Sequence, residues 1–295
     1  MISIIVVSKN LFFLNQFKDS VKNTVGVPFE IIVVENNDSL YSISNGYNIG
    51  AKDASFDILS FVHEDIVFHT ENWGNILMNY FETLFNSGIL GIAGSSYLPI
   101  SPSDWWVSDS KYLHSYFLSN QKNGVVGRGV VCIDGVQDPH PVFSLDGMFL
   151  AMKKSVWKEF QFDESLDGFH GYDTSICYKV SQKYQNYFVP GILLEHFSKG
   201  YPNEKWLLNT IAANECVLPF ILEKKKIGSL NISLEIKSYR LFLRQLMKFS
   251  SNTSYKFLKA FYYLVPVFKF TKDWRALFFF ILYFLRYLIQ AIRIK

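Results

Sequence analysis

The chain has 295 residues, 17% of them aromatic, and a formal net charge of +3 at pH 7. This length can hold one large domain, or one domain with an extension. The three cysteines stand far apart without a CxxC pair, which argues against a disulfide framework and a zinc cluster and fits a reducing, cytoplasmic compartment. The opening residues, Met1–Val7, lack a basic segment and predict a strand rather than a signal peptide.

The net charge hides a difference between two parts of the chain. Residues 1–220 carry 14 Lys and Arg against 23 Asp and Glu, a net charge of −9. Residues 221–295 carry 15 Lys and Arg against 3 acids, a net charge of +12. Because charge that differs by region indicates regions of different kind, we expect a globular domain over 1–220 and a basic, aromatic-rich helical region over 221–295.

The first sixty residues alternate between two kinds of pattern. Short β-branched apolar runs at Ile2–Val7, Glu30–Val34 and Ile58–Val62 predict buried parallel strands. The segments between them, Leu11–Val25 and Ser44–Ala54, predict crossover helices. This order predicts a doubly wound α/β sheet, which binds its ligands at the carboxyl ends of the strands.

Those strand ends carry polar side chains, namely Ser8-Lys9-Asn10, Glu35-Asn36-Asn37-Asp38 and His63-Glu64-Asp65. The chain has no GxGxxG after the first strand and no GxxxxGK[ST], so the common Gly-rich phosphate loops are missing. A metal ion held by acidic side chains at a strand end is the expected substitute, because Mg²⁺ and Mn²⁺ take oxygen ligands and bridge to phosphates. Acids after a strand are also common in surface turns.

The middle of the chain mixes loop and strand patterns. Gly94–Asn123 is rich in Ser and Pro and predicts a loop, with Trp105 and Trp106 in its middle. Strand-like segments follow at Val125–Ile133 and Val142–Met152, and a helical segment begins at residue 155.

Three polar residues in this part stand next to apolar runs. Asp146 lies inside the apolar stretch 143–152, where unpaired burial is costly, so it faces a cleft or binds a backbone turn. Asp173 begins a predicted helix, either as its N-cap or as a general base that the helix dipole keeps ionised. His196 ends an apolar strand. It is either structural or, if close to Asp65, part of a mixed oxygen and nitrogen site that suits Mn²⁺ better than Ca²⁺.

The C-terminal region predicts helices interrupted at Gly228, Ser250–Thr253 and Pro266. Its last run, Trp274–Ile292, is nearly all apolar and aromatic and as a helix would extend roughly 30 Å. Arg286 inside this run disfavours a spanning helix, because an arginine near the bilayer centre costs about 2.5 to 3.5 kcal/mol on insertion scales.

Basic and aromatic residues together favour helices that lie in the interface of an anionic membrane surface. Nucleic acid is the alternative partner for so basic a region. The long apolar run argues against it, so we expect no nucleic acid to bind.

The order of these motifs over nearly all of residues 1–220 resembles that of the family-two inverting glycosyltransferases. These enzymes have the GT-A fold, an α/β fold with a Rossmann-like, mostly parallel central sheet flanked by helices. The resemblance is closest to a bacterial subgroup with His-x-Asp in place of the usual DxD motif. It rests on these segments: Ser44–Gly50, Phe61–Ile66, Trp105-Trp106, Leu145-Asp146-Gly147, Tyr172-Asp173 and His196-Phe197-Ser198.

The resemblance implies a nucleoside-diphosphate sugar as donor and a divalent metal, Mn²⁺ or Mg²⁺. It assigns the nucleoside pocket to Ser8, Asn10, Glu35 and Asn48. Asp65 would hold the metal that binds the donor diphosphate, with His196 as a further ligand. His63 stands at the place of the first DxD carboxylate and would bind the donor, either through the metal or by a hydrogen bond to the ribose.

The implied reaction is a single in-line displacement that inverts the anomeric carbon, with Asp173 removing the proton of the acceptor hydroxyl. We expect Trp105, Trp106 and Asp146 on the acceptor side, because aromatic faces suit sugar rings and an acid binds hydroxyls. Core packing is the alternative for the two tryptophans.

We expect the acceptor to be a saccharide, lipid-linked, in the synthesis of a bacterial surface polysaccharide such as O-antigen. The protein would then lie peripherally on the cytoplasmic face of the inner membrane.

Two other functions compete with this interpretation. A nucleotidyltransferase uses a similar sheet and metal site, but its Gly-rich, basic opening loop is missing, since residues 6–14 contain no Gly and only Lys9 as a basic residue. The second alternative is a non-catalytic, membrane-associated module that binds sugar nucleotides.

Overall fold

The computed structural model describes residues 1–103, 105, 109–121, 127–130, 138–197, 202–228 and 230–293. The chain divides into two compact units. The sheet unit comprises Met1–Tyr97 and Ser110–Gly200, and the helical unit comprises Leu98–Asp109 and Tyr201–Lys295. The boundary that we expected after residue 220 falls inside a helix, α6 (Glu204–Ile227).

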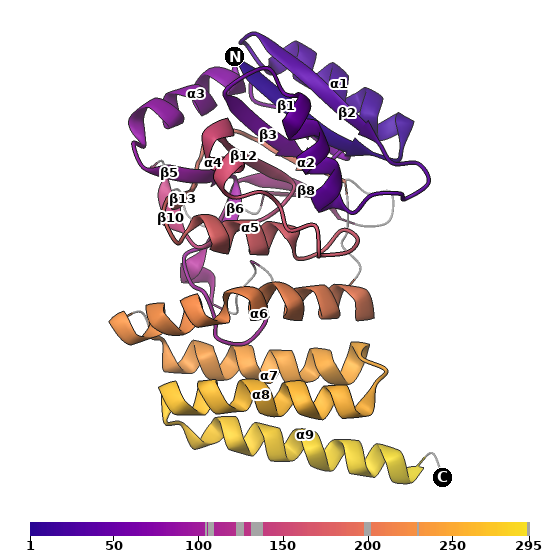
Figure 1. Cartoon of the computed structure of the whole chain (residues 1–295), viewed down its shortest axis with the longest axis vertical. Coiled ribbons are helices and arrows are strands. Elements are labelled where there is room, and N and C mark those ends of the chain that lie inside the picture. The colour runs from indigo at the N-terminus through magenta and orange to yellow at the C-terminus, as the bar shows by residue number, and fades with distance from the viewer. Residues whose placement is uncertain are drawn as a thin grey trace. The chain divides into compact units, whose positions relative to one another are not determined.

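The sheet unit is built on a seven-stranded sheet (Figure 1). Its strands, from one edge to the other, are β10 (His140–Val142), β13 (Gln185–Phe188), β5 (Ser87–Gly91), β12 (Phe149–Lys153), β3 (Ile58–Val62), β1 (Ile2–Ser8) and β2 (Phe29–Glu35). Strand β1 pairs in parallel with β2 and β3, and β13 pairs in parallel with β5. Strands β10 and β12 are antiparallel to their neighbours. The expected α/β fold with a mostly parallel sheet is therefore confirmed.

Helices flank this sheet: α1 (Leu11–Thr24), α2 (Ile43–Asp53), α3 (Trp73–Thr83), α4 (Lys154–Glu159) and α5 (Tyr172–Val180). All seven residues of β1 are buried, which explains its unbroken apolar sequence. Helix α2 packs closely on β1 because it carries two glycines. A Cβ at Gly46 would lie 2.5 Å from a methyl of Val7, and one at Gly50 would lie 2.4 Å from a methyl of Ile5.

Two smaller sheets complete this unit. One contains β11 (Ser144–Leu145), β6 (Ala93–Ser95) and β7 (Leu113–Ser115). The other contains β4 (Ile66–Phe68), β14 (Leu194–His196), β8 (Phe117–Gln121) and β9 (Gly127–Val130).

Two predictions for this part of the chain were wrong. The segment Gly94–Asn123 is not one loop, because it contains β7, β8 and a 3₁₀ turn (Ser110–Tyr112) that follow part of β6. These short strands form through pairing with distant segments, which composition does not reveal. The run Val142–Met152 is not one strand, because a turn at residues 146–148 separates β11 from β12. Of the strand expected at Val125–Ile133, residues 125–126 and 131–133 lie outside the described residues.

The described part of the helical unit contains α6, α7 (Ile232–Phe249), α8 (Thr253–Thr271) and α9 (Trp274–Arg293), drawn from orange to yellow in Figure 1. Helix α7 contacts both α8 and α9. The helices begin at asparagine caps: Asn203, Asn231 and Asn252 each accept a hydrogen bond from a backbone N–H of α6, α7 and α8 respectively.

The breaks expected at Gly228 and near residues 250–253 are confirmed. The break expected at Pro266 was wrong, because α8 continues through that residue. A proline inside a helix costs about 3 kcal/mol. Burial of Tyr263, Leu264 and Val267 on the same helix opposes that cost. No helix in the described part of the chain combines the length and the apolar character needed to cross a membrane.

Candidate functional site

Two backbone registers bring distant side chains together beyond the end of β3. The N–H of His63 donates to the carbonyl of Met148 at 3.1 Å, which places His63 beside the turn at residues 146–148. Strand β14 pairs with β4 so that His196 lies opposite Ile66. The N–H of Phe197 then donates to the carbonyl of Asp65 at 3.0 Å. These pairings bring His196 next to Asp65, 131 positions earlier in the sequence.

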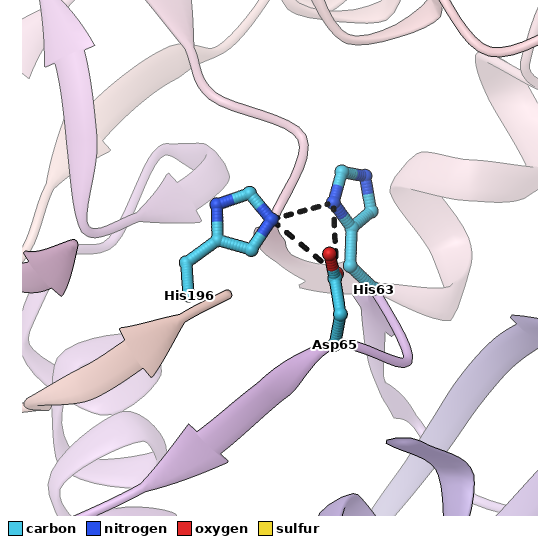
Figure 2. Close-up of side chains that lie close together, drawn as sticks. All are labelled: His63, Asp65 and His196. Carbon is cyan, nitrogen blue, oxygen red and sulfur yellow. Dashed lines mark hydrogen bonds and ion pairs between the residues drawn. The ribbon is translucent and has the colours of Figure 1, made fainter. Parts of the chain in front are cut away.

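The side chains of His63, Asp65 and His196 point toward one another (Figure 2). The Nε2 atom of His196 lies 3.3 Å from Oδ1 of Asp65 and 3.4 Å from Nδ1 of His63. Nδ1 of His63 lies 3.9 Å from the same Asp65 oxygen. The three side chains remain 28%, 20% and 15% exposed in chain order, so a ligand can reach them.

This donor set fits a divalent metal ion. Ligand atoms that share an ion at about 2.1 Å lie roughly 3 to 3.5 Å apart, and the three separations here are close to that range. Among the described residues, these three form the one such group of potential ligands. Two imidazole nitrogens and one carboxylate oxygen suit transition metals such as Mn²⁺. His196 therefore lies close enough to Asp65 to share a ligand with it.

Burial and mutual charge set the pKa values of these three side chains. Burial would lower the pKa of His196, but the hydrogen bond to Asp65 and its negative charge outweigh burial and raise that pKa. Burial likewise opposes ionisation of Asp65, but His196 and His63 hold its pKa below the ordinary aspartate value. Burial and the nearby His196 lower the pKa of His63. The cluster thus favours an ionised Asp65 beside a neutral His63.

Tyr172 fixes the orientation of the His63 ring, a role that no pattern in the sequence indicated. Its hydroxyl lies 2.7 Å from Nε2 of His63 and its side chain is buried. A Cβ at Gly147 would lie 1.9 Å from that hydroxyl, so a glycine is required there. For Nδ1 of His63 to ligate a metal, Nε2 must carry the proton and donate a hydrogen bond to the hydroxyl of Tyr172.

Asp173 and Asp146 both bind the backbone of the turn at residues 146–148. Asp173 lies in the first turn of α5, where Oδ2 accepts from the N–H of Gly147 at 3.1 Å and Oδ1 from the N–H of Thr174 at 2.8 Å. Asp146 accepts from the N–H of Met148 at 2.8 Å. One helix N-terminus therefore supplies both Tyr172 to the cluster of His63, Asp65 and His196 and Asp173 to the adjacent turn.

Glu64 anchors the end of β1, where Ser8 and Asn10, two residues expected to contact the nucleoside, lie. This carboxylate accepts from the hydroxyl of Ser8 at 2.6 Å and from the N–H groups of Lys9 and Asn10 at 3.0 and 2.9 Å. It ties the segment between β3 and β4 to the end of β1, a role that no pattern in the sequence indicated. Glu35 pairs with Ser8 across β1 and β2, and its side chain is exposed. Ser8 and Glu35 thus lie together at the carboxyl edge of the sheet, as predicted.

The structure gives two other expected pocket residues different roles. The carbonyl oxygen of the Asn10 side chain caps α1 by accepting from the N–H groups of Phe12 and Phe13. Asn48 is buried, and its amide donates to Phe162 and Glu164 and accepts from Trp157 and Phe162. These four hydrogen bonds use the whole capacity of an amide. Asn48 therefore holds the segment after α4 against α2 rather than lining a pocket.

The two tryptophans expected near the acceptor are Trp105 and Trp106. Trp105 belongs to the helical unit and is half-buried. Trp106 lies outside the described residues. Their role stays a prediction.

A family model described as "Glycosyltransferase like family" matches residues 3–216, which is well over half of the chain. The chain belongs to this glycosyltransferase-like family. The match contains every residue of the cluster and of the turn beside it. No curated protein matches the chain significantly.

Solved structures resemble this family member at low identity. GalNAc-T7, solved with UDP, GalNAc and Mn²⁺, is 14% identical with a TM-score of 0.50, over 73% of this chain and 48% of that chain. The chain thus spans about half the length of GalNAc-T7. S. aureus TarS 1–349 in complex with UDP-GlcNAc is 11% identical with a TM-score of 0.45, over 92% of this chain and 73% of that chain. At 14% identity the likeness to GalNAc-T7 shows the fold, and the mixed sheet with its flanking helices is the GT-A fold.

Proposed function

We propose that this protein transfers a sugar from a nucleoside-diphosphate sugar to a saccharide acceptor with inversion, using a divalent metal held by His63, Asp65 and His196. The observation that carries the proposal is the convergence of two imidazoles and a carboxylate beside the turn that Asp173 binds. The family membership supports sugar transfer rather than the nucleotidyltransferase alternative.

The donor set favours Mn²⁺ over Mg²⁺, because imidazole suits transition metals and Mg²⁺ prefers oxygen ligands. The Mn²⁺ and UDP named with GalNAc-T7 are consistent with this choice. A bound ion would supply charge stabilisation to the departing diphosphate. His63, in the place of the first DxD carboxylate, would be a ligand, since its Nδ1 faces Asp65 and His196 (Figure 2). The assignment of the chain to a bacterial subgroup with His-x-Asp in place of DxD stays part of this proposal.

The chain's own residues would carry the remaining steps. Asp173 would remove the proton of the acceptor hydroxyl as that oxygen attacks the anomeric carbon. Its hydrogen bonds to the N–H groups of Gly147 and Thr174 stabilise the ionised form and aim the carboxylate. Ser8 and Glu35 would contact the nucleoside at the sheet edge, and Asp146 would bind acceptor hydroxyls.

The helical unit would place this reaction at a membrane. Helices α8 and α9 carry exposed large apolar side chains, among them Phe261, Val265, Phe278 and Ile281. Residues 221–295 also have a net charge of +12. This combination suits peripheral binding to an anionic surface, and we place the protein on the cytoplasmic face of the inner membrane. A lipid-linked saccharide acceptor in surface polysaccharide synthesis, such as O-antigen, follows from that location.

A thermal-shift screen of nucleotide sugars, with and without Mn²⁺, tests the donor and metal together, because a ligand of the native state raises the melting temperature. The best donor should raise the melting temperature only when the metal is present. Asp65→Ala should abolish that shift, whereas Asp53→Ala, which changes an exposed acid at the end of α2, should retain it. An unchanged metal-dependent shift in Asp65→Ala would remove Asp65 from the metal site.

Turnover of that donor then separates an enzyme from a non-catalytic binding module. Incubation with saccharide acceptors should yield free nucleoside diphosphate and a glycoside with inverted anomeric configuration, as seen by NMR. A product with retained configuration would overturn the single displacement.

A further inference from the structure

The helical unit contains a pocket of about 330 Å³ between α7 and α9. It lies at the lower end of the volumes typical of small-molecule sites. Its lining combines cationic and apolar side chains: Arg240, Leu243, Arg244, Met247, Lys248, Phe279, Leu282, Tyr283 and Arg286. No acidic residue from the described part of the chain lines it.

The four cations of this pocket come from two helices, α7 and α9. Arg240, Arg244 and Lys248 follow one another at intervals of four residues, so they lie on one face of α7. Arg286 joins them from α9. All four are exposed, and none forms an ion pair with a carboxylate of the described residues. Like charges held together without counter-charge favour an anionic ligand.

Packing orients at least one of these cations. The guanidinium of Arg240 lies 4.8 Å from the centre of the Phe279 ring, a cation–π contact between α7 and α9. A guanidinium held in this way loses less entropy when it binds a phosphate oxygen through two N–H groups.

One lining residue of the pocket, Tyr283, carries a buried hydroxyl that lacks a partner among the described residues. Tyr283 is 4% exposed, and its hydroxyl forms no hydrogen bond within the described residues. A buried hydroxyl without a partner costs free energy. An acceptor oxygen from a ligand in the pocket would satisfy it.

The apolar lining continues onto an exposed surface. Leu282 is 36% exposed, and Phe278, Ile281 and Leu285 on the same helix are 55%, 47% and 47% exposed. A free inorganic anion or a nucleic acid backbone would not bury such an apolar surface. A ligand with a phosphate and apolar chains would cover both parts at once.

We infer that this pocket binds the phosphate headgroup of a single anionic phospholipid, with the acyl chains on the exposed apolar residues of α9. Arg240, Arg244 and Arg286 bind the phosphate oxygens, and the hydroxyl of Tyr283 donates to one of them. This rests on the membrane association proposed above and is independent of the sugar transfer, so its tests measure binding alone.

Flotation of the full chain with vesicles tests the charge of the ligand. The protein should float with phosphatidylcholine vesicles that contain phosphatidylglycerol and remain unbound with phosphatidylcholine alone. R240Q/R244Q should weaken binding by more than about tenfold, because each loses charge-assisted hydrogen bonds. The control K237Q/K269Q removes the same charge at exposed positions outside the pocket and should weaken binding much less. An equal loss in both variants would indicate diffuse attraction and overturn the proposal.

Tyr283→Phe tests the pocket without changing charge. Calorimetry with a short-chain, monomeric phosphatidylglycerol should give one site per chain, and this variant should bind about two- to tenfold more weakly with little change in melting temperature. Unchanged affinity, with the variant folded, would exclude the Tyr283 contact. Inorganic phosphate that bound as tightly as the lipid would show a free-anion site and overturn the assignment to a lipid. Unchanged flotation of R240Q/R244Q would overturn the site altogether.

Discussion

The two units of this protein bury charge in different ways. In the sheet unit, His63, Asp65 and His196 keep between 15% and 28% of their side-chain surface exposed. In the helical unit, Lys225 and Glu235 form an ion pair at 2.9 Å with only 2% and 0% of their side chains exposed. The second oxygen of Glu235 accepts from the backbone N–H of Ile100 at 2.9 Å.

This difference separates a site from a structural contact. The Lys225–Glu235 pair is closed to solvent and satisfied by the protein, so it fixes how α6, α7 and the segment around Ile100 pack. The sheet-unit cluster is open and has two imidazoles around one carboxylate, so it can take a further ligand. Substitutions in the two groups should therefore have opposite effects on activity and stability.

Asp173→Asn should have the largest effect, a loss of transfer rate of about a thousandfold, because general base catalysis contributes about 10² to 10⁴. Donor binding and melting temperature should change little, since the amide oxygen can still accept from Gly147. Initial rates with saturating donor measure the loss. Asp19→Asn, at an exposed site on α1, is the matched control. A near-normal rate in Asp173→Asn would leave the reaction without its assigned base.

Lys225→Met should show the opposite pattern. It leaves Glu235 buried without its cation, which should cost about 3 to 5 kcal/mol in the free energy of unfolding of the helical unit. Lys226→Met is the control, because the Lys226–Glu223 pair is more than half exposed and such pairs contribute about 0 to 1 kcal/mol. Denaturant unfolding followed by circular dichroism measures both. Equal stability in the two variants would contradict a structural role for the buried pair.

Tyr172→Phe should weaken the affinity for Mn²⁺ by about 10- to 100-fold, the usual effect of removing a partner that orients a metal-binding histidine. The ring remains, so the aromatic packing against Tyr47 and Phe162 should persist. Titration calorimetry of the metal and of the nucleoside diphosphate gives the two affinities. A variant with unchanged Mn²⁺ affinity would show that His63 is not a ligand that Tyr172 orients.

The pH dependence of metal binding should be the smallest of these effects, about tenfold per pH unit. A metal binds only neutral imidazoles. Because the pKa of His196 is raised above the ordinary histidine value of about 6.5, a proton begins to compete with the metal for this ring at a pH above that value. The lowered pKa of His63 leaves that ring neutral over the same range. Affinity should thus be full at high pH and fall as the pH drops through the pKa of His196. A pH-independent affinity across this range would exclude His196 from the site.

The positions of helices and strands were predictable at the start of the chain and less so in the middle. The first three strands and two helices are local patterns of apolar residues, and the structure has them within one or two residues of the predicted bounds. Strands β6, β7 and β8 are short and depend on partners far away in sequence, so the Ser- and Pro-rich segment around them gave no such signal. Pro266 shows the same limit, because packing of α8 outweighs a local helix breaker.

The chemistry at the ends of the strands was predictable from the residue types, because a parallel sheet places the polar residues that follow its strands at one edge. His63, Asp65, Asp173 and His196 could be named from this rule and from the resemblance to glycosyltransferases. Which of these candidates lie together depends on how the segments pack. The pairing of β14 with β4 places His196 beside Asp65. The absence of a Cβ at Gly147 lets the hydroxyl of Tyr172 reach His63. Four internal hydrogen bonds show that Asn48 is a structural residue. Such contacts depend on atoms from segments a hundred or more residues apart, and local sequence does not encode them.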